Sequence, residues 1–395
     1  MADAFDAETM ALDSRRSWLV VGAAFLSMFT VFGVAYSFGE FFGPMADEFG
    51  TDRSETALFF AITTFAYFGL GIVSGRIADR VGPRRVMVTG GIAMVAGLLL
   101  TAEVQSIQVG YLTYGLGVGL GVACGYVPMV AAVGGWFEHR RAIALALAVA
   151  GIGTGTLVVV PVVDWLIDEH GWRQAYRMLA LAVAFLLMVA ALGAHRPPVG
   201  PEPPMPVREA IRGRTDFRLL YGSGVFFTIA LFMPFVFMAD YIDTIGGRGS
   251  AAVLVGLIGM TSIAGRLGFG ALADRFGLLA LYRVSFVGLT LSFPIWVLAD
   301  SSYPVLVVFA TVLGVSYGGF ISLSPAIMAD RFGTVGLGGL LGALYTAAGI
   351  GGLVGPPLLG AIIDRSGHTA AQWTACGAGA VAVALLSGLT PKADV

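Results

Sequence analysis

One arginine lies deep inside a long apolar stretch of this chain. The stretch runs from Gly256 to Arg275, and Arg266 lies about eight residues from its polar end. A helix rising 1.5 Å per residue would place that guanidinium roughly 12 Å inside a bilayer. A charge there costs at least ~2.5–3.5 kcal/mol and must face protein or a water-filled cavity. Because an arginine fork pairs bidentately with a carboxylate, we expect Arg266 to bind an anionic ligand.

The composition explains what surrounds this arginine. Of the 395 residues, 57% are hydrophobic and only 12% are charged, whereas soluble proteins carry about 25% charged residues. The apolar residues come in blocks long enough to cross a bilayer as helices and too long for barrel strands. The N-terminal tail is acidic and lacks the order of a signal peptide. We therefore expect an all-α polytopic membrane protein whose first span is retained.

Twelve candidate spans follow one another along the chain. Their approximate limits are 18–42, 56–78, 85–103, 107–135, 141–166, 173–194, 217–243, 251–273, 279–299, 303–328, 338–363 and 369–390. A polar gap rich in proline and arginine divides them six from six. We predict a tail at 1–17, a six-helix bundle at 18–195, a central loop at 196–216, a second six-helix bundle at 217–391 and a tail at 392–395.

Most arginines fall in the tails, in the central loop and in the short loops on the same side. The other side holds few arginines, Arg53 among them, and many acidic residues, such as Asp243 and Asp364. Positive loops stay in the cytoplasm. We therefore expect a multi-pass protein of the plasma (inner) membrane with both termini cytoplasmic.

The two halves of the chain repeat one another. The segment Gly75–Gly82, GRIADRVG, recurs as Gly270–Gly277, GALADRFG, at an offset of 195, and Asp168 recurs as Asp364 at an offset of 196. Parallel repeats of six spans place a substrate site at the interface of the halves near mid-membrane.

The segment Gly75–Arg85, GRIADRVGPRR, joins the second and third candidate spans. Its position, its side and its repetition resemble the loop signature of the major facilitator superfamily, in which this loop latches the cytoplasmic gate. A topogenic basic loop with no gating role is the alternative. The gating residues that the resemblance implies are Gly75, Arg76, Asp79, Arg80, Gly82 and Arg85, with Asp274 and Arg275 in the second half.

Three further stretches narrow the resemblance. They are YSFGEFFGPM from Tyr36 to Met45, WFEHRRAIA from Trp136 to Ala144, and Gly265-Arg266. Together they resemble the monocarboxylate transporter family, in its prokaryotic branch. That family moves small carboxylates such as lactate or pyruvate, commonly with a proton, and its eighth-span arginine binds the carboxylate. Arg266 occupies that place.

The resemblance and the spacing suggest further substrate contacts. Gly125-Tyr126-Val127-Pro128 matches a fourth-span pattern, and Cys124 shares this helix but points about 200° away from Tyr126. Tyr317 lies beside glycines, Tyr345 precedes a glycine cluster, and Tyr36 belongs to the first of the three stretches. For each tyrosine, a core aromatic with a satisfied hydroxyl is the alternative.

The chain departs from the animal members in its proton-handling groups. Those members often carry an aspartate one turn before the arginine, where this chain has Ser262, and a lysine in the first span, whereas the only lysine here is Lys392. Glu40 and Asp240 fall near span ends, and we interpret them as solvated interface residues. Because a bound carboxylate neutralises the permanently charged Arg266, we expect exchange of anions to outpace net uptake, although proton symport stays open.

Other classes of function fit less well. A dicarboxylate such as oxalate would prefer two deep cationic side chains, and only one is found. A sugar site would need amide side chains, and the chain has no asparagine. A drug carrier and a carboxylate sensor remain alternatives. The four histidines have no metal spacing, no phosphate-binding GxxxxGK[ST] segment exists, and the 56 glycines lie mostly within spans. We expect close helix packing from these glycines. We also expect no cofactor, no nucleic-acid partner and no enzyme activity. The expected partners are a small carboxylate, protons and lipid, with a monomer as functional unit.

Overall fold

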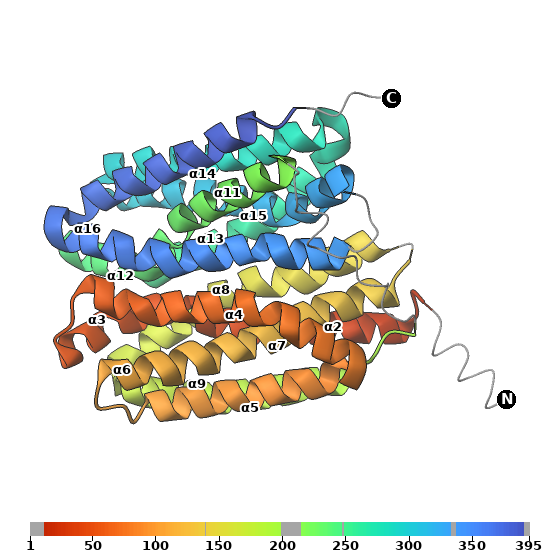
Figure 1. Cartoon of the computed structure of the whole chain (residues 1–395). Helices are drawn as coiled ribbons and strands as arrows, with labels where there is room; N and C mark the ends of the chain where they lie inside the picture. The colour runs from red at the N-terminus through yellow and green to blue at the C-terminus, as the bar shows by residue number, and fades with distance from the viewer. Residues whose placement is uncertain (1–11, 139, 199–214, 247–248, 333–336, 391–395) are drawn as a thin grey trace. The chain divides into compact units, whose positions relative to one another are not determined.

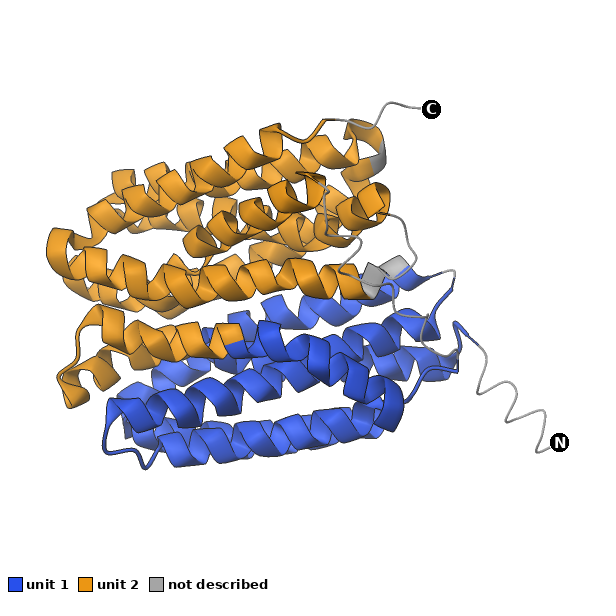
Figure 2. Ribbon diagram, in the orientation of Figure 1, with its two compact units in different colours: residues 1–37, 66–202 blue, residues 38–65, 203–395 orange. Residues whose placement is uncertain are grey.

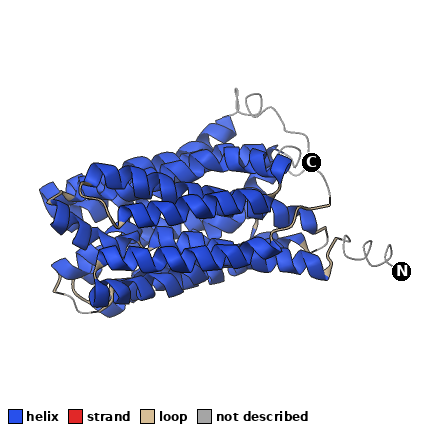
Figure 3. Cartoon of the chain, turned by 90° about the horizontal axis from the view of Figure 1, so that it is seen from below, coloured by secondary structure: helices blue, strands red, loops and turns tan. Residues whose placement is uncertain are grey.

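Helices account for all regular structure in the described part of the chain. The computed structural model describes residues 12–138, 140–198, 215–246, 249–332 and 337–390 (Figures 1 and 3). Apolar segments of this length satisfy their backbone groups in hydrocarbon by forming helices. The elements are α2 (Arg15–Tyr36), α3 (Phe38–Phe49), α4 (Arg53–Val81), α5 (Pro83–Thr101), α6 (Ile107–Gly110), η1 (Tyr111–Leu116), α7 (Gly117–Trp136), α8 (Arg141–His170), α9 (Trp172–Gly193), α11 (Thr215–Leu231), α12 (Met233–Thr244), α13 (Ala251–Phe276), α14 (Leu278–Ala299), α15 (Tyr303–Phe332) and α16 (Leu337–Ser387).

Eleven helical stretches of the described residues are long and apolar enough to cross a membrane. The last of them is part of α16, in which Gly367 has non-helical backbone angles and separates two helices. Counting its two arms separately yields twelve spans, as predicted. The fold class predicted from the sequence, an all-α polytopic membrane protein, is confirmed.

The first span differs from the prediction in length and continuity. It was expected at 18–42, but the helical stretch runs from Arg15 to Phe49 and is interrupted at Ser37. The Ser37 hydroxyl donates to the carbonyl of Val34 at 2.9 Å. Hydropathy alone missed the continuation because α3 carries acidic residues at its far end.

The described chain forms two compact units (Figure 2). One comprises Met1–Ser37 and Ala66–Glu202, and the other comprises Phe38–Phe65 and Pro203–Val395. In the second unit, Gly39 of α3 lies against the carbonyl of Phe235 on α12, and Gly360 of α16 lies against the backbone of Arg53 on α4. These close contacts group α3 and the start of α4 with the second half of the sequence. The bundle limits 18–195 and 217–391 stay a prediction.

The backbone of each unit repeats the irregularities of the other. Gly82 and Gly277, 195 residues apart, have φ of 92° and 85°, and Gly171 and Gly367, 196 apart, have φ of 77° and 80°. Glycine alone adopts such angles readily. Helix packing repeats too, since α2 packs on α8 as α11 packs on α16, and α5 on α7 as α14 on α15. The repeat read from the sequence is therefore present in the structure.

Glycines allow the closest helix approaches, as expected. A Cβ on Gly151 or Gly155 of α8 would lie 2.2 Å from the carbonyl oxygens of Phe25 and Phe29 on α2. Real Cβ atoms do not approach an oxygen so closely. Only glycine at these positions allows the two helices their present separation.

Candidate functional site

Arg266 lies in the middle of α13, in the second unit. It is 15 residues from Ala251 and 10 from Phe276, the ends of the helix, or about 22 and 15 Å at 1.5 Å per residue. Its side chain is buried, with 5% of the residue exposed. This places the guanidinium near the middle of a hydrocarbon layer about 30 Å thick.

An aromatic ring faces this guanidinium. The Cζ atom of Arg266 lies 5.8 Å from the ring centroid of Tyr317 on α15, within the range of a cation–π interaction. Tyr317 is buried, and its ring meets that of Phe235 on α12 edge to face, with centroids 6.3 Å apart. The structure thus brings together two residues that the sequence singled out, Arg266 and Tyr317, and adds Phe235.

Glycines set the distance between α13 and α15 at this point. A Cβ on Gly265 would lie 2.2 Å from the carbonyl oxygen of Val315. A Cβ on Gly318 would lie 2.1 Å from the carbonyl oxygen of Ser262 and 2.8 Å from the amide nitrogen of Arg266. Both helices therefore meet backbone to backbone on either side of the Arg266–Tyr317 pair, which fixes its geometry.

The predicted residues of the first unit fall in two places. Phe32 of α2 contacts Tyr36, Tyr67 and Tyr126, with ring centroids 5.6, 5.9 and 5.3 Å away. Tyr36 and Tyr126 therefore share one aromatic cluster, and Tyr67 joins them although its place in an apolar run offered no signal. The Cβ of Cys124 lies against Gly90 of α5. Cys124 and Tyr126 thus contact different helices, in agreement with their angular separation.

The last predicted contact, Tyr345, is half-buried on α16 of the second unit. Its neighbour Thr346 hydrogen-bonds the Tyr221 hydroxyl at 3.0 Å, which joins α16 to α11. Whether Tyr345, Tyr36, Tyr126 and Cys124 contact a substrate stays a prediction.

A second polar group joins α4, α12 and α16. We call Arg53, Asp240, Asp364 and His368 the Arg53 cluster. Arg53 donates from Nε to Oδ2 and from Nη2 to Oδ1 of Asp240, both at 2.8 Å, and from Nη1 to Oδ1 of Asp364 at 3.2 Å. The His368 Nε2 lies 2.7 Å from Asp240 Oδ2. All four residues belong to the second unit.

The interpretation of Asp240 as a solvated interface residue is wrong. Its side chain is only 16% exposed, and that of His368 only 8%. Burial is tolerated because the carboxylate accepts hydrogen bonds from two cationic or polar partners. The available signal was the presence of Arg53 among the few arginines on the acidic side.

The predicted gating loop lies in the first unit. Gly75, Arg76, Asp79 and Arg80 belong to the end of α4, and Gly82 turns the chain into α5. The Arg196 guanidinium donates to the backbone carbonyl of Asp79. In the second unit, Asp274 and Arg275 occupy the last turn of α13.

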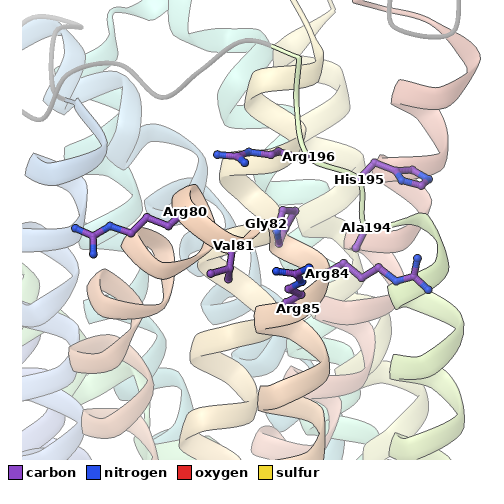
Figure 4. Close-up of a pocket in the computed structure, with 9 residues that line it drawn as sticks. Arg80, Val81, Gly82, Arg84, Arg85, Ala194, His195 and Arg196 are labelled. Carbon is purple, nitrogen blue, oxygen red and sulfur yellow. The ribbon is translucent and has the colours of Figure 1, made fainter. Parts of the chain in front are cut away.

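A pocket of about 430 Å³ opens beside this loop (Figure 4). Its walls are basic, with Arg84, Arg85 and Arg196 joined by His195. Partial burial, followed by the positive charges of Arg16 and Arg84, lowers the pKa of His195 below its ordinary value. Figure 4 shows the side chains of Arg80 and His195 on opposite sides of Gly82, so the basic groups do not converge on one point.

Comparison with known proteins decides the family. The model of the Major Facilitator Superfamily matches residues 21–289 and 220–394, which together cover nearly the whole chain. The chain belongs to the Major Facilitator Superfamily. It is therefore a transporter of the membrane-spanning, multi-pass kind, as its helices indicated.

Several relatives of this transporter carry informative names. Monocarboxylate transporter 13 of Rattus norvegicus is 30% identical over 380 residues, covering 93% of this chain and 87% of the relative. Monocarboxylate transporter 12 of the same species is 29% identical over 426 residues, covering 95% and 85%. The MFS transporter asaE of Aspergillus flavus is 29% identical over 363 residues, covering 89% and 81%. These are animal and fungal proteins, so the prokaryotic branch stays a prediction.

Within the second unit, one short helix of the transporter connects both polar groups. Phe235 of α12 packs against Tyr317, and Asp240 of α12 belongs to the Arg53 cluster. Five residues of helix separate them by about 7.5 Å. A displacement of α12 would therefore change the packing against Tyr317, the ring that faces Arg266, and the ion pairs of the Arg53 cluster at the same time.

Proposed function

We propose that this transporter moves small monocarboxylate anions, such as lactate or pyruvate, by alternating access. The observation that carries the proposal is the buried Arg266 guanidinium in the middle of α13, facing the Tyr317 ring. A planar fork of N–H donors matches the geometry of a carboxylate or a phosphate. The names of the two rat relatives support the same substrate class.

The surroundings of Arg266 favour a small substrate with one charge. Tyr317 and Phe235 offer apolar ring surface next to the cation, which suits the short carbon chain of lactate. A dicarboxylate would leave its second charge against this surface. Tyr345 is proposed as a further contact, and contacts from Tyr36 and Tyr126 stay predictions from the sequence.

The energy source is the gradient of the substrate or of protons. Proton symport and anion exchange both remain consistent with a permanently charged Arg266. We place the transporter in the plasma membrane with both termini cytoplasmic, on the strength of the arginine distribution. We take the monomer as the functional unit, since one chain carries both six-span repeats.

Uptake of labelled lactate into vesicles that hold the purified protein tests the proposal. Wild type is compared with Arg266→Lys and Arg266→Ala, with and without an inward proton gradient, and with or without unlabelled lactate inside. We expect both variants to lose uptake, because lysine keeps the charge but loses the bidentate fork. Stimulation by the proton gradient would indicate symport, and stimulation by internal lactate alone would indicate exchange.

Two results would refute the proposal. Unchanged uptake by Arg266→Ala would exclude Arg266 as the anchor. Binding of lactate by the wild type without any flux would indicate a sensor instead of a carrier.

A further inference from the structure

The Asp240 carboxylate of the Arg53 cluster is held by a cation and an imidazole at once. Arg53 occupies both oxygens, and His368 Nε2 shares Oδ2. A carboxylate that receives a bidentate guanidinium acts only as an acceptor, so Asp240 is ionised and His368 donates its Nε2 proton. In this state the Arg53 charge compensates Asp240.

The partners of Asp240 come from different helices. Arg53 is the first residue of α4, whereas Asp364 and His368 lie on either side of Gly367 in α16, which packs on α12. Moving the start of α4 away from α12 would remove Arg53 and would leave two carboxylates beside one imidazole. Asp243 of α12 interacts electrostatically with Asp240 and with Asp47 of α3, which adds acidic groups near the site. Arg365, next to Asp364 in α16, is basic but exposed to solvent.

A proton is the cation best suited to replace Arg53. A nearby positive charge disfavours protonation of a carboxylate–imidazole pair, and two nearby carboxylates favour it. The pair therefore binds a proton more tightly when Arg53 is absent than when it is present. Among the residues that the structure describes, no other basic side chain forms an ion pair with Asp240 or Asp364.

We propose that Asp240 and His368 form a proton-binding site at which the proton and the Arg53 guanidinium compete. With Arg53 engaged, the start of α4 is locked to α12 and α16 and the site holds no added proton. When the lock opens, the Asp240–His368 pair takes up one proton from the solution on its side. Acid therefore favours the open lock.

This inference rests on the proposed function for its role in transport. No titratable side chain lies one turn before Arg266, where the chain has Ser262, and the first span has no lysine. Asp240 and His368 supply a titratable pair at another place. Because α12 also carries Phe235, which contacts Tyr317, opening of the lock releases from Arg53 a helix that packs against the ring facing Arg266.

The backbone amide of Arg53 offers a direct measure of the lock. Its N–H donates to Asp364 Oδ2 at 3.1 Å, so opening exposes this amide to hydrogen exchange. Exchange of the segment around Arg53 is measured in the full-length protein in lipid nanodiscs without substrate, between pH 8 and pH 5.5, and corrected for the intrinsic pH dependence of exchange. We expect its protection factor to fall in acid by up to about tenfold per pH unit, the limit for one proton.

Two variants and one control isolate the site. His368→Gln keeps a donor for Asp240 but does not titrate, so protection should stay high and independent of pH in this range. Asp240→Asn removes the bidentate ion pair with Arg53 and leaves only Asp364, so protection should be lower than in wild type at every pH. His170→Gln is the matched control, since His170 is exposed beside Gly171, the equivalent of Gly367, and should behave as wild type.

Three results would overturn the proton site: wild-type protection constant within twofold across the pH range, protection that rises in acid, or an unchanged pH dependence in His368→Gln. Lactate uptake is measured separately on the same preparations. Absent lactate flux with the expected exchange behaviour would refute the proposed function and keep the proton site. Lactate flux with flat exchange would do the reverse.

Discussion

The most informative perturbation adds one methyl group next to Arg266. In Gly265→Ala, the new Cβ would lie 2.2 Å from the carbonyl oxygen of Val315, whereas ordinary contact begins at 3.4 Å. The difference of 1.2 Å must come from separation of α13 and α15. Because backbone atoms form the obstacle, no side-chain rotation can relieve it. The guanidinium of Arg266 and the ring of Tyr317 would move apart with their helices.

Overpacking of this kind costs about 1–3 kcal/mol. If this cost destabilises the substrate-bound state, the efficiency of lactate uptake, kcat/KM, should drop roughly 5- to 150-fold. The assay is initial-rate uptake of labelled lactate into vesicles over a range of concentrations, with protein quantity and thermal unfolding measured on the same preparations.

Gly268→Ala is the matched control for this prediction. It is the same substitution three residues later in α13, and its Cβ would meet no atom within 4 Å. Any effect of alanine on helix propensity is therefore shared by both variants. Equal uptake kinetics in the two variants, with both correctly folded, would refute the view that the close approach of α13 and α15 sets the geometry at Arg266.

Three further predictions concern other parts of the molecule. Tyr317→Ala should raise the KM for lactate about 2- to 30-fold, the worth of a partly desolvated cation–π contact, whereas Tyr317→Phe should stay within threefold of wild type in the same uptake assay. The pKa of His195 is lowered in the folded state. Its contribution to stability is therefore present above about pH 6.5 and is lost as the pH falls through the unfolded-state pKa and then the folded-state pKa. The acid-induced fall in unfolding temperature should be smaller in His195→Gln. Gly82→Ala should lower the unfolding temperature because φ there is 92°, and Gly69→Ala, which meets no atom within 4 Å and has no positive φ, should not.

Much of the fold was accessible from the sequence because its signals are local. Spans follow from runs of apolar residues, and the turns at Gly82 and Gly277 follow from a motif that occurs twice. The importance of Arg266 was equally clear, since a charge in an apolar span needs a reason wherever its neighbours lie. Its buried position near Tyr317 agrees with that reasoning.

The Arg53 cluster could not be predicted from the sequence because its contacts join residues that are far apart in the chain. Arg53 and Asp240 are 187 residues apart, and Arg53 and Asp364 are 311 apart. A polar residue at the end of a span has the same local pattern whether water or a distant arginine satisfies it. Only the fold decides whether water or an arginine is the partner, and here it places the start of α4 beside α12 and α16.

The corner at Gly367 has a mechanical consequence. A single residue departs from helical geometry there, so the two arms of α16 are joined directly, without a loop between them. The first arm, Leu337–Ser366, has 30 residues and is about 45 Å long. If this arm is straight, a tilt of about 10° at the corner would displace its far end by about 8 Å. Asp364 and His368 lie on either side of Gly367, so the proposed change in their charge would act at the point about which the arm tilts.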